Sequence, residues 1–387
     1  MKLIYIANAR IPTERAHGIQ IMKMCEGFSS QGLKVELVIP GRKNQIKENA
    51  WQYYSQKPSF EIEYLKIIDF MRISIPRVSF WLQSRSFLKA VILFLKKEKA
   101  DIIYSRDLVF VKRLSSFHKN VFYEMHSLPR SFNKNDLEKV KGIITITQGL
   151  KDALIKKGIS EDKILIAPDG VDLDKFDIKI TKQEARKKLN LPQDKKIALY
   201  TGHLYEWKGA TVLLKAAQNF QFSISNFQNI LFIFVGGTEK DVSSFKHQVS
   251  IIKLNNVLVV GHRPYQEIPY WLKAADVLIL PNSAQEPISK YWTSPMKMFE
   301  YMASQRPIVT SDLPSIREVL DENNAILAEP DSPHGLAEGI KRALKNPDFS
   351  DKISAKAWET VQEYTWNKRT GRILGFMKNI AYEDIAN

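Results

Sequence analysis

The feature that most constrains the fold of this chain is a repeated alternation of short apolar runs with segments of helix length. The runs are continuously hydrophobic, which is typical of strands covered on both faces of a parallel sheet. They form two successive sets: KLIYIAN, KVELVIP, DIIYSRD, VFYEMH, GIITITQ and KILIAP, then KIALYTG, ILFIFVGG, NVLVVGH, DVLILPN, RPIVTSD and NAILAEP. The pattern predicts an α/β fold of two doubly wound, Rossmann-like parallel-sheet domains.

The boundary between the two domains is expected where apolar density falls, in APDGVDLDKFDIKITKQEARKKLNLPQDKK. A length of 387 residues also suits two domains. We therefore predict a first domain over residues 1–170 and a second over 171–364. The segment 365–387 has a helical pattern and is expected to pack back on the first domain.

The positive charge of the chain is concentrated in its first half. Residues 1–170 hold 29 Lys and Arg against 17 acids, within a total net charge of +15. Residues 71–99 alone hold seven Lys and Arg against one acid, and FWLQSRSFLKAVILFLKK spaces Trp81, Leu88, Ile92 and Leu95 at helical intervals. Such a stripe is either the buried face of a core helix or a basic amphipathic surface for an anionic bilayer. No window is expected to be apolar enough to span a membrane.

The single cysteine, Cys25, cannot form an internal disulfide, and its helical apolar surroundings favour core packing over a catalytic role. The first residues lack a signal-peptide pattern. A reducing cytoplasm is the simplest expected location, with the inner face of the cell membrane as a possible site of peripheral contact. No nucleic-acid-binding motif accompanies the basic charge, so nucleic acid is not an expected partner.

The stretch SPMKMFEYMASQRPIVTSD contains an unusual helix start. Ser294 and Pro295 suit the cap and first position of a helix, yet Lys297 then lies in the first turn, where the helix dipole disfavours a cation. A phosphate group bound at the helix start would resolve the conflict. A solvated lysine is the alternative interpretation.

Other candidate residues follow predicted strands, where ligands bind in doubly wound sheets. Gly202 ends a strand and Lys208 lies in the next loop, either facing a phosphate or solvated. His126 follows VFYEMH, and Gly18 is expected just before the first helix. Several motifs are missing: GxGxxG after the first strand, GxxxxGK[ST], HExxH and GxSxG. The acids of DLD at 172–174 suit a helix start better than a metal site, so no metal is expected.

Taken together, these pieces resemble a retaining glycosyltransferase of family four with the two-domain GT-B fold. The resemblance runs through YEMH, ITITQGL, APDGVDLDKF, YTGHLYEWKGA, FIFVGG, NVLVVGHRPYQEIPYWLKAADVLILP and TSPMKMFEYMASQRPIVTSDLPSIREVL. It implies two domains facing across a cleft and transfer of a sugar from a nucleotide-diphosphate donor to a glycan, lipid-linked or other acceptor. It implies no cofactor and no bound metal.

The resemblance also implies roles for individual residues. Glu300 resembles the glutamate that binds the donor ribose, Lys208 the lysine that neutralises the diphosphate, and His126 the histidine near the donor sugar. The donor-binding residues implied are Gly18, Gly202, His203, Arg263, Ser294, Pro295, Met296, Lys297 and Met298.

Three positions depart from the family pattern. Trp292 stands where the family often has a first glutamate, and Glu286 is out of register. His203 replaces a common arginine, so Arg263 is the expected second fixed charge. Ala16 and His17 precede Gly18 where two glycines are usual. Two alternatives stay open: a nucleotide-sugar epimerase of the same fold, which would need several acids in the cleft, and a non-catalytic scaffold, which Trp292 and His203 favour.

Overall fold

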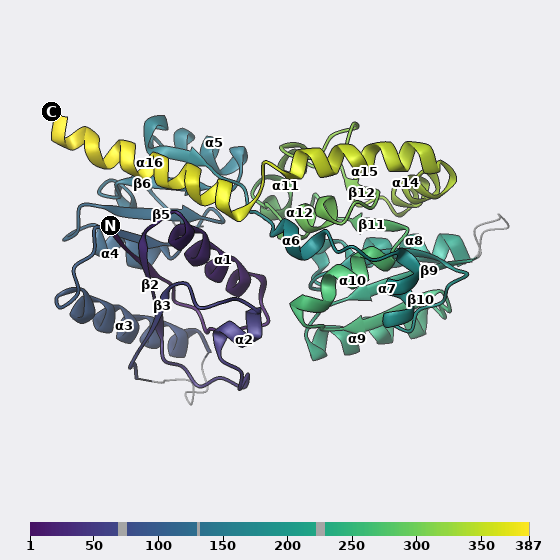
Figure 1. Cartoon of the computed structure of the whole chain (residues 1–387), viewed down its shortest axis with the longest axis horizontal. Coiled ribbons are helices and arrows are strands. Elements are labelled where there is room, and N and C mark those ends of the chain that lie inside the picture. The colour runs from purple at the N-terminus through teal and green to yellow at the C-terminus, as the bar shows by residue number, and fades with distance from the viewer. Residues whose placement is uncertain (69–75, 130–131, 222–228, 387) are drawn as a thin grey trace. The chain divides into compact units, whose positions relative to one another are not determined.

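The computed structural model describes residues 1–68, 76–129, 132–221 and 229–386, which form two compact units. Unit 1 comprises Met1–Pro168 and Trp366–Asn387, and unit 2 comprises Asp169–Thr365. The last helix thus lies in unit 1, against the first helix (Figure 1). The chain passes between the units next to Pro168 and again next to Thr365, where the predicted boundaries were 170 and 364.

Unit 1 contains a seven-stranded parallel sheet in the order β3-β2-β1-β4-β5-β6-β7. Its strands are β1 Lys2–Ile6, β2 Lys34–Pro40, β3 Glu61–Leu65, β4 Ile102–Ser105, β5 Val121–Met125, β6 Gly142–Thr145 and β7 Ile164–Ile166. Its helices are α1 Ala16–Ser30, α2 Ala50–Tyr54, α3 Pro76–Leu95, α4 Leu108–Leu114, α5 Gln148–Lys156 and α16 Trp366–Ala386, with short turns η1 Lys134–Asp136 and η2 Glu161–Lys163.

Unit 2 contains a six-stranded parallel sheet in the order β10-β9-β8-β11-β12-β13. Its strands are β8 Lys196–Thr201, β9 Ile230–Val235, β10 Val257–Gly261, β11 Val277–Leu280, β12 Ile308–Ser311 and β13 Ile326–Ala328. Its helices are α6 Leu173–Phe176, α7 Lys182–Lys188, α8 Ala210–Gln221, α9 Glu239–Ile251, α10 Ile268–Ala274, α11 Pro287–Tyr291, α12 Met296–Ala303, α13 Pro314–Arg317, α14 Pro333–Lys345 and α15 Pro347–Val361, with η3 Glu206–Lys208 and η4 Tyr265–Glu267.

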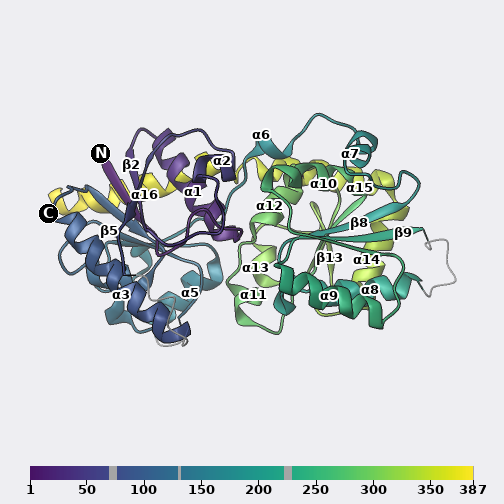
Figure 2. The same ribbon diagram turned by 90° about the horizontal axis from the view of Figure 1, so that it is seen from below.

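Helices cover both faces of each sheet, as Figure 2 shows for unit 2. Successive residues of β8 therefore enter different cores: Ile197 and Leu199 pack on one face, Ala198 and Tyr200 on the other. In each sheet the strand order reverses beside the first strand, at β1/β4 and at β8/β11. This is the doubly wound arrangement predicted from the sequence, and its switch points are the expected ligand sites.

Unit 1 contains a buried ion pair between its last helix and its sheet. Arg369 of α16 is fully buried, and its Nη2 donates to Glu124 Oε1 on β5 at 2.7 Å. Glu124 also accepts hydrogen bonds from Gln20 and Tyr104, both at 2.6 Å. Burial raises the pKa of the Glu124 carboxyl, but the charge of Arg369 and the hydrogen bond from His126 outweigh it and hold the pKa well below its usual range. Glu124 is therefore a buried carboxylate that depends on Arg369.

The first testable prediction concerns this pair. Arg369→Met removes the cation and leaves the carboxylate of Glu124 charged and buried, so we expect a loss of about 3–5 kcal/mol in the free energy of unfolding. Arg372→Met is the matched control, because Arg372 lies one turn further along the same helix and is exposed. Urea unfolding followed by circular dichroism measures both. Equal midpoints for the two variants would contradict a stabilising role of the pair.

Candidate functional site

The candidate site in unit 2 lies at the carboxyl ends of β8 and β11. Gly209, which ends the loop after β8, has a φ of +75°, and a Cβ built there would lie 1.6 Å from the carbonyl oxygen of Pro281. Only glycine allows this contact, because it has no side chain and tolerates positive φ. The same loop is fixed by Ser283 N, which donates to Trp207 O at 3.1 Å. These contacts hold Lys208 at the switch point of the sheet.

Lys297 enters the site from the first turn of α12. Its Nζ donates to Thr201 O at 3.1 Å and lies 3.8 Å from the centroid of the Tyr200 ring. The side chain is 9% exposed. A solvated lysine, one of the two interpretations of the sequence, is therefore wrong: Lys297 is buried beside the end of β8. Gly202, with a φ of +123°, lies against it, since a Cβ there would be 3.6 Å from Lys297 Nζ.

The two lysines repel each other. Burial, opposed by the charge of Asp169, lowers the pKa of Lys208 to about 8. Burial and the charge of Lys208 lower the pKa of Lys297 well below its usual value, although Glu300 acts in the opposite direction. A bound anion would restore both pKa values towards normal, because it favours the charged form of each ammonium. The pair therefore has the electrostatics of an anion site.

The start of α12 differs from the prediction. The helix begins at Met296, Pro295 is the N-cap residue, and no side chain caps it. Ser294 Oγ instead accepts a hydrogen bond from the backbone N of Asp169, at 3.0 Å. Because this hydroxyl is already used to fix the 169 loop, it does not cap the helix. Met298 is fully buried, so only its backbone is available to a ligand.

Glu300 follows Lys297 by one turn and is also buried, at 6% exposure. Its Oε1 accepts a hydrogen bond from the hydroxyl of Tyr265 at 2.9 Å. Burial raises the pKa of Glu300 to about 7, against the opposing effects of the Tyr265 hydrogen bond and the charge of Lys297. Glu300 can therefore change its charge near neutral pH.

Two further predicted residues, His203 and Arg263, lie in the loops after β8 and β10. His203 stacks on Tyr205, with ring centroids 4.8 Å apart, and its carbonyl oxygen accepts from the hydroxyl of Tyr200. Arg263 is exposed, two residues before Tyr265, so the Tyr265 hydrogen bond brings its loop to Glu300. No described residue forms an ion pair with Arg263. Its role as a second phosphate charge stays a prediction.

In unit 1, His126 directly follows β5, and its Nε2 lies 2.9 Å from Glu124 Oε1. His17 is nearby: burial and the charges of Arg106, Arg15 and His126 lower its pKa to about 4. His17 is therefore neutral at physiological pH, whereas the carboxylate of Glu124 orients His126.

Gly18 does not lie before the first helix as expected, because α1 already begins at Ala16. A Cβ at Gly18 would lie 2.1 Å from the hydroxyl of Tyr54, which in turn accepts from Thr13 N at 2.8 Å. Packing against Tyr54 is thus sufficient reason for a glycine here. Its predicted approach to a donor phosphate remains a prediction.

Sequence reasoning missed four residues of these groups: Glu124, Asp169, Tyr200 and Tyr265. Each lies within a quoted motif, since Glu124 is in YEMH, Asp169 in APDGVDLDKF, Tyr200 in YTGHLYEWKGA and Tyr265 in GHRPYQEIP. Only the hydrogen bonds and charge effects of the folded chain distinguish them from neighbours in the same motifs.

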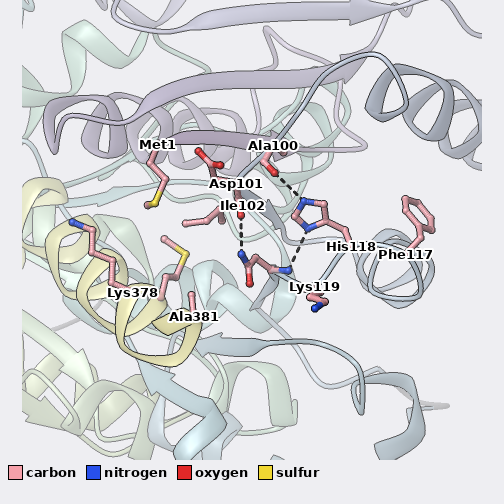
Figure 3. A pocket seen from close by; sticks show the side chains of 11 residues that line it. Met1, Ala100, Asp101, Ile102, Phe117, His118, Lys119, Lys378 and Ala381 are labelled. Carbon is pink, nitrogen blue, oxygen red and sulfur yellow. Dashed lines mark hydrogen bonds between the residues drawn. The ribbon is translucent and has the colours of Figure 1, made fainter. Parts of the chain in front are cut away.

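A separate cavity of about 570 Å³ lies at the opposite, amino-terminal edge of the sheet in unit 1 (Figure 3). Its polar groups satisfy one another. His118 Nε2 lies 3.0 Å from Ala100 O, its Nδ1 accepts from Asn120 N, and the side chain of Asn120 donates to Asp101 O at 3.0 Å. None of the predicted site residues lines this cavity. Among the described residues, no three His, Cys, Asp or Glu side chains gather as a metal site.

The two parallel-sheet units define the class: this chain has the GT-B fold. Residues 181–360 match the family model described as "Glycosyl transferases group 1", and residues 18–175 match "Glycosyltransferase Family 4". The chain is therefore similar to the group 1 glycosyltransferases over most of unit 2 and to the family 4 glycosyltransferases over most of unit 1.

Among curated proteins, the putative teichuronic acid biosynthesis glycosyltransferase TuaC of Bacillus subtilis is 26% identical over 222 residues, 57% of this chain and 51% of that protein. The chain thus spans about half the length of the curated relatives it matches.

Two solved structures match nearly the whole chain. Sucrose-phosphate synthase from Thermosynechococcus elongatus has a TM-score of 0.77 at 17% identity, covering 99% of both chains. Anabaena Alr3699/HepE in complex with UDP has a TM-score of 0.74 at 16% identity, covering 98% of this chain and 100% of that chain. At such identities the likeness establishes the GT-B fold.

The second prediction concerns anion binding to the two lysines. Sulfate keeps the same charge between pH 6.5 and 9.5, so any change of its affinity in this range comes from the protein. We expect affinity to fall as pH rises through about 8, because Lys208 then loses its proton, with a limiting slope of about tenfold per pH unit. Isothermal titration calorimetry measures it. Lys215→Met, at an exposed lysine of α8, is the control and should keep the profile. A flat affinity between pH 7 and 9 would exclude Lys208 from the anion site.

The third prediction concerns Glu300. Tyr265→Phe removes the donor that favours the ionised carboxylate, so we expect its pKa to rise above about 7, by roughly one to two units. The measurement is a ¹³C NMR titration of labelled glutamate carboxyls, with the Glu300 signal assigned from Glu300→Gln. Tyr270→Phe, on the adjacent helix, should leave the titration unchanged. A pKa that stays near 7 in Tyr265→Phe would show that the hydrogen bond has no influence on Glu300.

Proposed function

We propose that this chain is a retaining glycosyltransferase that moves a sugar from a nucleotide-diphosphate donor to a glycan or lipid-linked acceptor. The observation that carries the proposal is the group in unit 2: the half-buried Lys208 and the buried Lys297, both with lowered pKa values, beside a buried carboxyl on the next turn of α12. A nucleoside diphosphate has both complementary parts, since its phosphates are anionic and its ribose hydroxyls are donors to a carboxylate.

The proposed roles follow from these contacts. Lys208 and Lys297 balance the charge of the diphosphate, and Glu300 accepts from the ribose hydroxyls once it is ionised. The proposal is supported by the homology to glycosyltransferases and by the neighbour HepE, whose structures hold UDP and UDP-glucose.

In the proposed reaction, the bond between the anomeric carbon and the diphosphate breaks, and the acceptor oxygen bonds to the same face of that carbon. The acceptor proton passes to the leaving phosphate. Negative charge grows on the diphosphate during this step, so fixed cations beside it lower the barrier. Fixed lysines can supply this charge, and we propose that no bound metal is needed. The role of His126 near the donor sugar rests on the family resemblance.

The fourth prediction tests this site in two measurements. The first is a thermal-shift assay with UDP, GDP and ADP, with and without magnesium. We expect one of the three nucleotides to raise the melting temperature of the chain by roughly 5 °C or more when its concentration is a hundredfold above its Kd. Lys208→Ala or Glu300→Ala should remove this shift and reduce sugar transfer by about 10²–10³-fold. Both variants should stay folded, because neither side chain belongs to a hydrophobic core.

Lys215→Ala is the matched control and should retain both the shift and the turnover. Near-normal transfer by either site variant would refute the assigned roles. An epimerised donor instead of a glycosylated acceptor would identify the epimerase alternative, and the absence of any nucleotide shift would favour the scaffold alternative.

A further inference from the structure

Near the start of α3, polar side chains are buried and apolar side chains are exposed, which is the reverse of the usual distribution. Ser79 and Gln83 are buried, at 2% and 1% exposure, whereas Phe80 and Trp81 are 55% and 53% exposed. Leu93, further along the helix, is 50% exposed. Of the stripe Trp81, Leu88, Ile92 and Leu95, Trp81 is exposed and the other three are half-buried, so the stripe is not a fully buried core face. Folding of unit 1 alone gives no reason for two neighbouring aromatic side chains in water.

The other face of α3 fixes the helix firmly in unit 1. Phe87 and Val91 are fully buried, and the rings of Phe87 and Phe110 lie 5.2 Å apart. Asn8, in the loop after β1, donates to Ser84 Oγ at 2.9 Å. This bond places the Trp81 end of α3 at the carboxyl edge of the sheet, the edge that also carries His126.

By length and composition, α3 includes an 18-residue window, Val78–Leu95, that is apolar enough to cross a membrane, with a mean hydropathy of 1.3 and 22% of it buried. The sequence-based prediction that no window is apolar enough to span a membrane is therefore wrong by this measure. The helix connects β3 to β4, however, and both strands run parallel in one sheet. A spanning helix would place these strands on opposite sides of a bilayer, so α3 does not cross a membrane.

The charges around the exposed aromatic side chains are positive. The guanidinium of Arg85 lies 4.5 Å from the centroid of the Trp81 ring. Lys89, Lys96 and Lys97 are exposed on the same helix and its end. Glu98 is the acid among residues 78–99, and Lys2 neutralises it at 2.8 Å.

We propose that the outer face of α3 docks unit 1 on an anionic lipid bilayer. Exposed aromatic rings suit the interface between headgroups and acyl chains, and lysine and arginine beside them attract anionic headgroups. A purely apolar partner surface would leave these cations unpaired, and a nucleic acid would leave the aliphatic side chains in water. The occupant that matches both properties is the bilayer surface.

The surface also indicates the acceptor class, an inference that rests on the proposed function. Because the Trp81 end of α3 shares its sheet edge with His126, a docked bilayer brings lipid headgroups to the edge that carries His126, the residue proposed to lie near the donor sugar. We infer that the acceptor is lipid-linked.

The fifth prediction is tested by cosedimentation of the full chain with vesicles of phosphatidylglycerol and of phosphatidylcholine. We expect binding to the anionic vesicles that weakens with salt. The double variant Phe80→Ser/Trp81→Ser should reduce the affinity for anionic vesicles about tenfold or more. The variant Lys96→Gln/Lys97→Gln should reduce the same affinity about fivefold for each charge removed. Phe117→Ser is the matched control, because Phe117 is 52% exposed in unit 1 but lies outside α3.

Three outcomes would overturn the proposal. These are failure of the native chain to bind anionic vesicles at low salt, binding by the Phe80→Ser/Trp81→Ser variant that is as tight as that of the native chain, or a loss of affinity in Phe117→Ser as large as that in the double variant. Sedimentation of the chain without vesicles provides a fourth. If the native chain is a dimer that Phe80→Ser/Trp81→Ser dissociates, the outer face of α3 binds a second copy of the chain and not a bilayer. Failure of the proposed function is seen separately, as the absence of a nucleotide-dependent thermal shift in a chain that still binds vesicles. The double variant should keep the nucleotide shift of the native chain.

Discussion

The parallel direction of every strand is the constraint on which the rest of this structure depends. Parallel neighbours require a crossover between them, so each strand ends in a loop at one common edge and the chain returns through a helix. In unit 2 this brings the loop after β8, the loop after β10 and the start of α12 to one switch point. Lys208, Tyr265 and Lys297 come from these three elements. Residues about 90 positions apart in the sequence therefore share one small volume of low dielectric, and their charges act on one another.

The architecture was accessible from the sequence because buried parallel strands are continuously apolar. Twelve strands coincide with quoted runs, whereas β3, Glu61–Leu65, was missed. It is the edge strand of its sheet and is largely exposed, with the sequence EIEYL. An edge strand needs no second apolar face, so its composition resembles that of a loop. The starts of helices were less predictable. Ser294 contacts Asp169, and Gly18 packs against Tyr54; no local sequence pattern contains these tertiary contacts.

The charges of the site could be predicted only in part. The sequence shows that lysines follow the predicted strands, but it does not show whether these lysines are solvated or buried. Burial decides this question: it leaves Lys297 with a lowered pKa and Glu300 with a raised one. Such a site is unfavourable for the empty protein, since like charges lie together in a poorly solvated place. The same arrangement requires little reorganisation when an anion arrives, which is the property a site for developing negative charge needs.

Tyr265 offers a physical explanation for the departures from the family pattern at Trp292 and Glu286. The resemblance leads one to expect a second carboxylate eight residues before Glu300, but Trp292 ends α11, and Glu286 is exposed at the start of that helix. A second buried carboxylate beside Glu300 would raise the pKa of the pair further, because two like charges disfavour ionisation. Here the neighbour of Glu300 is instead a neutral donor, and its hydrogen bond favours the ionised form. Tyr265 thus opposes the effect of burial and favours the ionised form of the single buried carboxyl, whose pKa is about 7.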